Sequence, residues 1–251
     1  MVWMFDSHIH LSDPAYQKDL GFIIKNMEQM HIKACCVSMD LANSKKTLEI
    51  AKKNDLILPF IGIHPESLNE NLEEMLNFIQ ENIDCISGIG EIGLDPTYVR
   101  SEHDRHKQIT IFQALLSIAE KYQKPVSIHS RKSLDDIFEI MRSYSTKNAL
   151  LHWFDGSKKQ LQKAMDLGFF VSYGPVLVYA NDKQTLLTKT DEEKILVETD
   201  GPVRFSRCFE MKQAQIGFIP SVIFCASKIL NKPYDELTSI LQKNSLNFLG
   251  I

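Results

Sequence analysis

The sequence predicts an α/β protein folded as a closed (β/α)₈ (TIM) barrel, and three observations support this. Short apolar runs recur along the 251 residues, an amphipathic segment follows each of them, and no linker rich in Gly, Ser or charge divides the chain. Strands that alternate with helices favour a parallel sheet with right-handed crossovers. Eight such units fit one barrel domain spanning residues 1–251, with an open doubly wound sheet as the alternative.

The expected strands are the eight apolar runs, in chain order Val2–Phe5, Ala34–Ser38, Leu56–Ile61, Cys85–Ile89, Pro125–Ile128, Ala149–Leu151, Phe169–Ser172 and Ile195–Val197. The expected helices lie between and after them, at Ala15–Met30, Ser44–Lys53, Leu72–Asn82, Asp104–Gln123, Leu134–Arg142, Lys158–Leu167, Asp182–Thr188, Ile219–Leu230 and Tyr234–Leu249. The first helix has its apolar residues at spacings of three and four, which is typical of one buried face. Ser133 and Ser157 stand where helix N-caps are expected, and Pro233 lies near the first turn of the last helix.

Composition excludes several classes of protein. With 44% hydrophobic and 24% charged residues the chain has an ordinary globular composition, and its net charge of −4 provides no general basic field for nucleic acid. The five cysteines show no CxxC spacing, so we expect mostly buried thiols in a reducing compartment. The sequence does not open with a leader-like segment, and it contains no apolar run that approaches the roughly 18 residues of a membrane span. We therefore expect a cytoplasmic protein without membrane contact. No signal of an obligate protein partner is evident.

Polar residues gather at the carboxyl ends of the predicted strands. His8 and His10 follow the first strand, His64 the third, Glu91 the fourth, His129 the fifth, His152 ends the sixth and Asp200 follows the eighth. Each alone has an ordinary explanation, such as a turn residue, a core histidine or a loop carboxylate. In a (β/α)₈ barrel, however, catalytic groups come from this end of the strands, so the joint placement predicts one site.

The stretch FDSHIH shows the pattern on a small scale. Side chains alternate along an extended chain, which puts Asp6, His8 and His10 on one face. Two imidazoles with this spacing can reach one metal ion. Asp6 is better interpreted as a residue that holds a histidine than as a ligand.

This set offers nitrogen and oxygen ligands, which suit Zn²⁺, Mn²⁺, Fe²⁺ or Co²⁺, and a bridged pair also accepts Mg²⁺. Six metal ligands exceed what one ion uses, so we expect two divalent ions about 3.5–4 Å apart that share a bridging carboxylate. Glu91 is the expected bridge. His8, His10 and Asp200 would hold one ion, and His129 and His152 the other. Asp200 is also the expected general base, for attack at phosphorus or at a carbonyl carbon.

Other catalytic signatures are weak. The chain has no GxSxG elbow, no Walker loop and no GxGxxG after a strand. GIGEIG is rich in glycine, but the acidic residue in its middle would repel a pyrophosphate.

The motifs FDSHIHL, IGIHPE, GIGEIGLD, IHSR, LHWFDGS and ETDGP, in this order, resemble those of the TatD family of metal-dependent deoxyribonucleases in the amidohydrolase superfamily. The resemblance runs to QKNSLNFLG near the end of the chain, with Asn244 and Phe248 in place. It implies a TIM-barrel hydrolase that cleaves DNA phosphodiesters, typically from the 3′ end, with single-stranded DNA or DNA ends as substrate. It also implies two divalent ions (Zn, Mg or Mn), the first at His8, His10, Glu91 and Asp200 and the second at Glu91, His129 and His152. His64 resembles the family's histidine that contacts phosphate.

Departures from the family pattern border the site without removing a ligand. Trp153 and Asp155 stand where Cys and Ser are usual, and Gly201 replaces a frequent Ser. We expect Arg131 and Arg204 to bind phosphate, and Trp153, Tyr98 or Tyr173 to stack on an unpaired base or to pack at the rim. The alternative function is a two-metal amidohydrolase-type enzyme acting on a small ester, lactone or amide.

Overall fold

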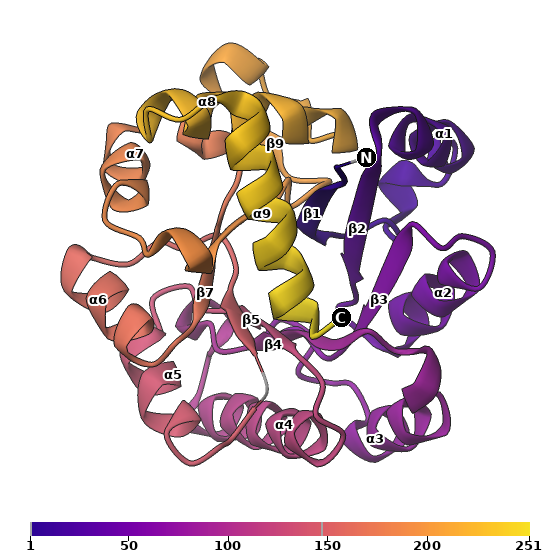
Figure 1. Cartoon of the computed structure of the whole chain (residues 1–251). Coiled ribbons are helices and arrows are strands. Elements are labelled where there is room, and N and C mark those ends of the chain that lie inside the picture. The colour runs from indigo at the N-terminus through magenta and orange to yellow at the C-terminus, as the bar shows by residue number, and fades with distance from the viewer. Residues whose placement is uncertain (1, 147) are drawn as a thin grey trace.

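The computed structural model describes residues 2–146 and 148–251, and in this part of the chain eight strands form one parallel sheet in the order β1 to β8. Figure 1 shows the strands in the middle of the molecule and the helices around them. The predicted (β/α)₈ barrel is therefore confirmed. The eight strands are β1 (Met4–Ile9), β2 (Ile32–Val37), β3 (Ile57–Ile61), β4 (Gly88–Gly93), β5 (Val126–His129), β6 (Ala149–Leu151), β7 (Phe170–Tyr173) and β8 (Ile195–Val197).

The helices follow the strands around the barrel. They are α1 (Leu20–Met30), α2 (Leu41–Ala51), α3 (Leu72–Glu81), α4 (Glu102–Lys121), α5 (Leu134–Met141), α6 (Lys158–Asp166), α7 (Asn181–Leu187), α8 (Ile219–Ile229) and α9 (Tyr234–Leu249). A short antiparallel hairpin, β9 (Arg204–Phe205) with β10 (Lys212–Gln213), lies between β8 and α8. The sequence did not indicate this hairpin, because its strands have only two residues each.

Two predicted strands were placed too early. The strand expected at Val2–Phe5 is β1, which continues to Ile9, and the strand expected at Cys85–Ile89 is β4, which continues to Gly93. Apolar runs end where the polar site begins, although the backbone stays extended. Both strands shift register at the site, β1 between Asp6 and Ile9 and β4 between Ile89 and Ile92. Such irregularities re-aim side chains.

The first predicted helix begins later than expected. Asp13 caps a 3₁₀ turn, η1 (Pro14–Tyr16), and α1 starts only at Leu20. The buried Tyr16 hydroxyl donates to the Ala214 carbonyl at 2.5 Å and anchors this turn. The cap at Ser157 is confirmed as a capping box with Gln160, and Ser133 is confirmed as the N-cap residue of α5, although its side chain makes no capping hydrogen bond. The Ser133 hydroxyl instead donates to the Leu94 carbonyl and joins α5 to the end of β4.

The barrel closes between β8 and β1 through residues just beyond β8. The Asp200 amide donates to the His8 carbonyl at 2.9 Å, and the His10 amide donates to the Gly201 carbonyl at 2.8 Å. The Thr199 amide adds a bond to the Asp6 carboxylate at 3.0 Å. The segment that carries Asp200 is therefore fixed against the end of β1, which carries His8 and leads to His10.

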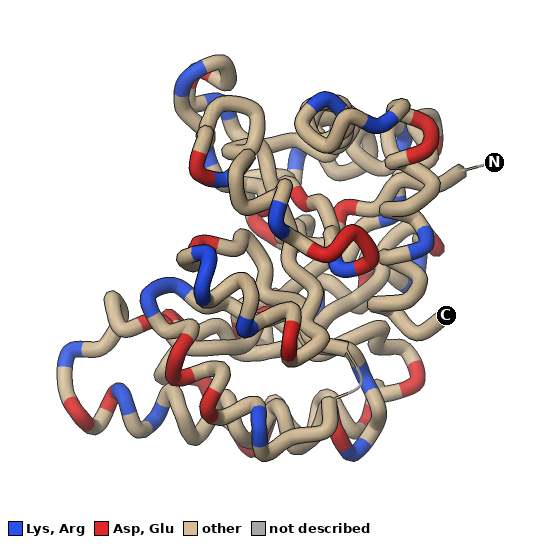
Figure 2. Tube along the Cα trace, turned by 60° about the vertical axis from the view of Figure 1, so that its left-hand side comes forward, with Lys and Arg blue, Asp and Glu red and all other residues tan. Residues whose placement is uncertain are grey.

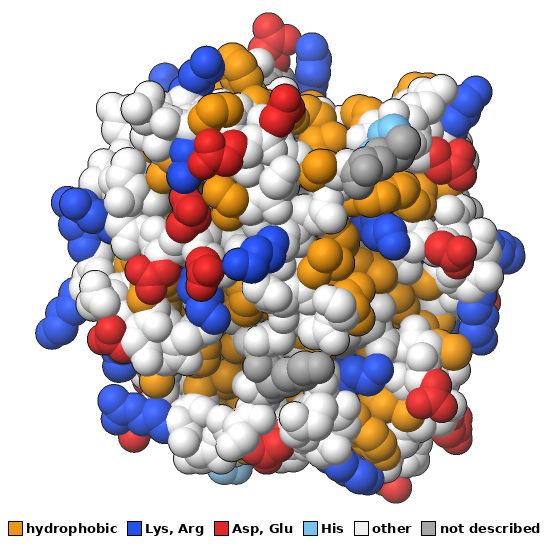
Figure 3. All heavy atoms as spheres, in the orientation of Figure 1, with side chains coloured by type: hydrophobic (Ala, Val, Ile, Leu, Met, Phe, Trp, Pro, Cys, Tyr) orange, Lys and Arg blue, Asp and Glu red, His pale blue; other side chains and the backbone are white. Residues whose placement is uncertain are grey.

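The opposite end of the barrel is filled by apolar side chains and covered by α9, which lies across it in Figure 1. Phe248 of α9 stacks on Phe60 and meets Phe170 edge to face, inside a buried cluster of residues from β1, β2, β3, β6, β7 and β8. The space-filling view of the same face shows side chains filling the middle of the molecule (Figure 3). Asn244 fixes α9 by donating to the Glu192 and Ile195 carbonyls.

The cysteines differ from expectation in burial. Cys35 and Cys36 are buried, but Cys85 and Cys208 are exposed and Cys225 is intermediate, and all are free thiols. Among the described residues no helix is both long and apolar enough to cross a membrane.

Candidate metal centre

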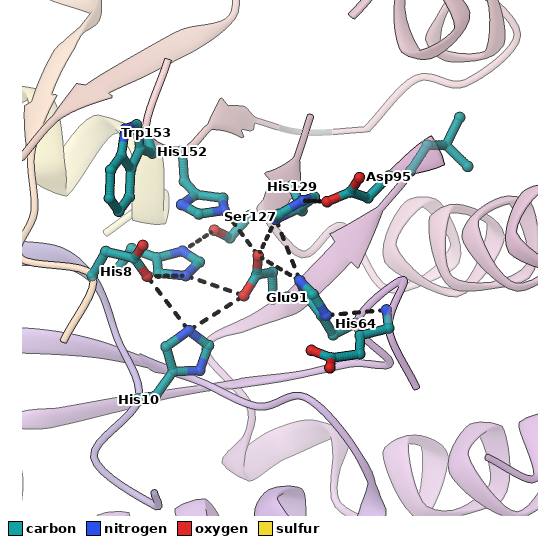
Figure 4. A network of polar contacts seen from close by, with 12 residues as sticks. His8, His10, His64, Glu91, Asp95, Ser127, His129, His152 and Trp153 are labelled. Atoms are coloured by element: carbon teal, nitrogen blue, oxygen red, sulfur yellow. Dashed lines mark hydrogen bonds and ion pairs between the residues drawn. The ribbon is translucent and has the colours of Figure 1, made fainter. Parts of the chain in front are cut away.

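Glu91 lies at the centre of the site, with imidazoles on both of its carboxylate oxygens (Figure 4). It stands within β4, and its side chain is 3% exposed. The structure brings the sequence-predicted residues together from six strands or the loops that directly follow them, and the set comprises His8, His10, His64, Glu91, His129, His152 and Asp200.

The Oε2 atom of Glu91 faces one group of residues. The Nε2 atoms of His8 and His10 each lie 3.3 Å from it. The same two nitrogens each lie 3.6 Å from Oδ1 of Asp200. Two imidazoles and two carboxylates therefore converge on one small volume.

The Oε1 atom of Glu91 faces a second group. Nδ1 of His129 and Nε2 of His152 each lie 2.8 Å from it, and Nε2 of His64 lies 3.4 Å away. His64 also lies 3.3 Å from His129 through ring nitrogens. Glu91 thus separates two sets of nitrogen atoms, one for each carboxylate oxygen.

The electrostatics of the cluster favour ionised carboxylates. Burial opposes ionisation of Glu91, but His64, His152 and His8 outweigh burial and hold the pKa of this carboxyl well below its usual range. Burial likewise opposes ionisation of Asp200, and the His10 hydrogen bond lowers its pKa overall. Two buried carboxylates are costly unless positive charge compensates them, and the imidazoles supply it here.

The imidazoles do not behave alike. Burial lowers the pKa of His8 below its usual value. Burial also favours a lower pKa at His10, but hydrogen bonds to Asp200 and Glu91 outweigh it and raise the pKa of His10 to about 9. At His152 the Glu91 charge outweighs burial and raises the pKa well above the usual value. A divalent cation would replace the protons that these rings hold beside the carboxylates.

Further residues orient the imidazoles. The Ser127 hydroxyl lies 3.0 Å from Nδ1 of His8, and Oδ2 of Asp95 lies 2.9 Å from Nε2 of His129. Each ring therefore has one nitrogen held by a neighbour while the other faces Glu91, as is typical of metal-ligating histidines. The buried Gln108 amide of α4 donates to the Pro65 and Asp95 carbonyls, which ties together the loops that carry His64 and Asp95.

Glu198 was missed by the sequence interpretation. It is fully buried, accepts from the Ser172 hydroxyl at 2.5 Å and from the Trp153 amide at 2.8 Å, and lies 3.8 Å from Nδ1 of His152. Ser127 was missed as well. Each lies two residues before a chosen site residue, so the alternation of an extended chain was a usable signal for both.

Asp6 holds the backbone rather than an imidazole. Its carboxylate accepts from the His8 amide at 3.2 Å and from the Thr199 amide and hydroxyl at 3.0 and 2.5 Å. The pairing of β1 with β2 shifts register between Asp6 and Ile9. Burial raises the pKa of Asp6 to about 8.

A cavity of about 670 Å³ opens above the cluster. Arg131 lines it, whereas Arg204 lies on β9 and donates to the Met211 carbonyl of its own hairpin. The remaining lining residues are His10, Asp13, Met39, His64, Glu66, Glu91, Tyr98, His129, Ser130, His152, Trp153, Asp155, Asp200, Pro202 and Val203. Its volume lies in the range of small-ligand sites.

GIGEIG forms the buried strand β4 and not a phosphate loop. Gly93 has a φ of +148°, and a Cβ there would lie 2.0 Å from the His129 carbonyl oxygen. The glycine is needed because β4 and β5 approach closely at the site.

A parallel barrel with histidines and carboxylates at the carboxyl ends of its strands defines this chain as a metal-dependent hydrolase of the TIM-barrel class. The chain belongs to the TatD-related DNase family, whose model matches residues 5–250.

Similar proteins cover most of the chain. An uncharacterized metal-dependent hydrolase of Bacillus subtilis, YabD, is 25% identical over 255 residues, 99% of each chain. The human deoxyribonuclease TATDN3 is 26% identical over 215 residues, 80% of this chain and 78% of that protein. The crystal structure of YjjV, a TatD homolog from Escherichia coli, superposes with a TM-score of 0.90 at 21% identity, over 99% of this chain and 98% of that one. The structural similarity to YjjV shows that the two chains share a fold.

Proposed function

We propose that the chain is a two-metal phosphodiesterase that cleaves DNA, acting as a 3′–5′ exodeoxyribonuclease. The observation that carries this proposal is the arrangement around Glu91, whose two carboxylate oxygens face two separate sets of imidazoles. Membership of the TatD-related DNase family and the similarity to a human deoxyribonuclease support DNA as the substrate.

The residues present fit two divalent ions. The buried atoms Nε2 of His8 and Nδ1 of His152 have no hydrogen-bond partner among the described residues, which leaves His8 with a free ligand atom toward Glu91 and Asp200. Ligand atoms of His8, His10 and Glu91 lie within 4.8 Å of one another, as do those of His64, Glu91 and His129. We assign one ion to His8, His10, Glu91 and Asp200, and the other to Glu91, His129 and His152, with zinc, magnesium or manganese as candidates.

When bound, such ions supply an activated water and polarise the phosphoryl oxygen. The protein's own groups complete the chemistry. Asp200 is ionised and faces both His8 and His10, so it is placed to accept the proton of the attacking water. His64 and Arg131 line the cavity beside the cluster and are placed to contact the phosphate.

Charge on the surface is mixed. Figure 2 shows basic and acidic residues interspersed along the chain, in agreement with a net charge of −4. DNA would therefore be held by local contacts in the cavity rather than by a general field. Arg131 is the better placed of the two predicted phosphate contacts, because Arg204 donates to its own hairpin. Arg131→Ala is expected to weaken binding of single-stranded DNA and to reduce its salt dependence, and Arg204→Ala to change both less.

The test is cleavage of a 5′-labelled single-stranded oligonucleotide in Mg²⁺ or Mn²⁺, resolved on a sequencing gel. Wild type should give a ladder that shortens from the 3′ end. Glu91→Gln and EDTA should each abolish it, because Glu91 joins both metal sets. Folded, metal-loaded wild-type protein that leaves the oligonucleotide intact would contradict the proposal.

The alternative is hydrolysis of a small ester, lactone or amide by the same residues. A panel of carbonyl esters, lactones and amides, assayed beside the oligonucleotide with the same protein, separates the two. Turnover of a carbonyl substrate that Glu91→Gln abolishes, without cleavage of DNA, would favour the alternative.

A further inference from the structure

One wall of the cavity is aromatic. Trp153 follows β6, lines the cavity, and its indole stacks on the Phe205 ring with centroids 5.3 Å apart and planes 28° apart. Phe205 is 2% exposed, so it supports the indole from behind rather than facing solvent. We call Trp153 and Phe205 the aromatic wall.

The wall is held rigidly. The Trp153 amide donates to the buried Glu198 carboxylate at 2.8 Å and lies 3.2 Å from the Ser172 hydroxyl, and its backbone has a left-handed φ of +40°. Behind it, Phe205 meets Phe209 edge to face at 6.1 Å, and Phe209 meets Phe218 at 4.8 Å. The indole orientation is therefore set before any ligand arrives, which lowers the entropic cost of stacking.

The aromatic wall lies beside the cluster of histidines and carboxylates around Glu91. Figure 4 shows Trp153 next to His152 and on the side of His8, across the cluster from His64 and Asp95. Arg131 and Tyr98 also line this cavity. A ligand with an anionic group at the cluster and a flat ring beside it would match both parts of the cavity.

The other predicted stacking residues are less suitable. Tyr173 is buried, and its hydroxyl bonds to Thr190 at 2.7 Å, so its ring packs in the core. Tyr98 lines the cavity beside His64, with ring centroids 5.8 Å apart, and thus lies where the phosphate is expected.

We propose that the aromatic wall is a subsite for an unpaired nucleobase, and that Trp153 stacks on the base of the nucleotide next to the scissile phosphate. The proposal rests on the proposed nuclease function. Stacking on an aromatic side chain accepts every base, so the subsite selects unpaired ends without reading sequence. Loss of the indole should weaken binding roughly 5- to 150-fold.

The first experiment measures binding without turnover. The chain has two tryptophans, and Trp3 lies at the start of the chain, packed against His31. In a Trp3→Phe variant loaded with Mg²⁺, deoxyadenosine monophosphate should quench Trp153 fluorescence saturably, while deoxyribose 5-phosphate should not. Equal quenching by both ligands, or quenching by neither, would overturn the subsite.

The second experiment compares oligonucleotides with a normal and an abasic 3′-terminal residue. Trp153→Leu should raise KM for the normal end roughly 5- to 150-fold, leave the abasic end unchanged, and be largely rescued in Trp153→Phe. An equal rise in KM on both substrates would mean that Trp153 only supports the rim of the cavity and would refute the proposal. An unchanged KM on both substrates would refute it as well. If metal-loaded wild type cleaves neither substrate, the proposed nuclease function fails, and the fluorescence titration alone decides on the aromatic wall.

Discussion

The two ends of the barrel are built from the same strands and have opposite chemistry. β1 carries Phe5 of the apolar cluster near its start and His8 near its end, and β6 carries Leu150 of the same cluster and leads directly to His152. At the first end α9 inserts Phe248 into an apolar cluster. At the second end, the predicted metal ligands surround Glu91 beneath an open cavity.

The two ends of the barrel contribute to different properties of the protein, one mainly to stability and the other to the chemistry of the site. The α9 end buries aromatic and aliphatic surface, which is the main favourable contribution to folding. The Glu91 end buries charges that the imidazoles compensate, but their desolvation offsets much of this gain, so this end contributes less to folding than the α9 end. Substitutions at the two ends should therefore affect different measurements.

The largest expected effect is at the Glu91 end. Asp200→Asn should lower kcat on the proposed DNA substrate roughly 10²- to 10⁴-fold, because the proton acceptor is lost. Metal-free Asp200→Asn should unfold at a lower temperature than metal-free wild type, because the lowered pKa of Asp200 means that its charge is stabilised beside His10, which would lose this partner. Wild-type rates in this variant would refute the role of Asp200.

At the other end, Phe248→Ala should reduce the free energy of unfolding by about 3–5 kcal/mol, since it leaves a cavity among buried aromatic rings. Denaturant unfolding measures this. The number of metal ions bound per folded chain, determined by elemental analysis, should equal that of wild type. A variant that keeps its stability but loses metal would reverse the assignment of the two ends.

Metal should stabilise the protein only through the Glu91 end. A divalent ion at about 100 times its Kd should raise the free energy of unfolding by about 2.7 kcal/mol per site. Thermal unfolding with and without EDTA measures the difference. Phe248→Ala should keep this increment and Glu91→Gln should lose it, and an equal increment in Glu91→Gln would place the metal elsewhere.

The smallest expected effect concerns the attachment of α9. Asn244→Ala removes two hydrogen bonds, to the backbone carbonyl of Glu192 before β8 and to that of Ile195 at the start of β8, and should cost about 1–3 kcal/mol. Denaturant unfolding again provides the measurement. Metal binding should be unchanged, and a stability equal to that of wild type would show that packing alone holds α9.

Much of the architecture was predictable from residue patterns. The predicted helix Tyr234–Leu249 coincides with α9, and the strands Ala149–Leu151 and Ile195–Val197 coincide with β6 and β8, because apolar periodicity is a local property. The errors in the predicted strand ends lie where the residues become polar although the backbone remains an extended strand. β1 and β4 continue through His8 and Glu91, since the barrel buries these polar side chains in its mouth.

By itself, the sequence determined the order of strands and helices and the residue types at each strand end, because both are encoded in short segments. Only the tertiary structure decided that Glu91 lies between two sets of imidazoles and that Asp6 is held at Thr199. It also revealed Glu198 under His152 and Trp153. The reason is physical: these contacts join residues up to 193 positions apart, and their geometry depends on register shifts and on barrel closure, which no local pattern encodes.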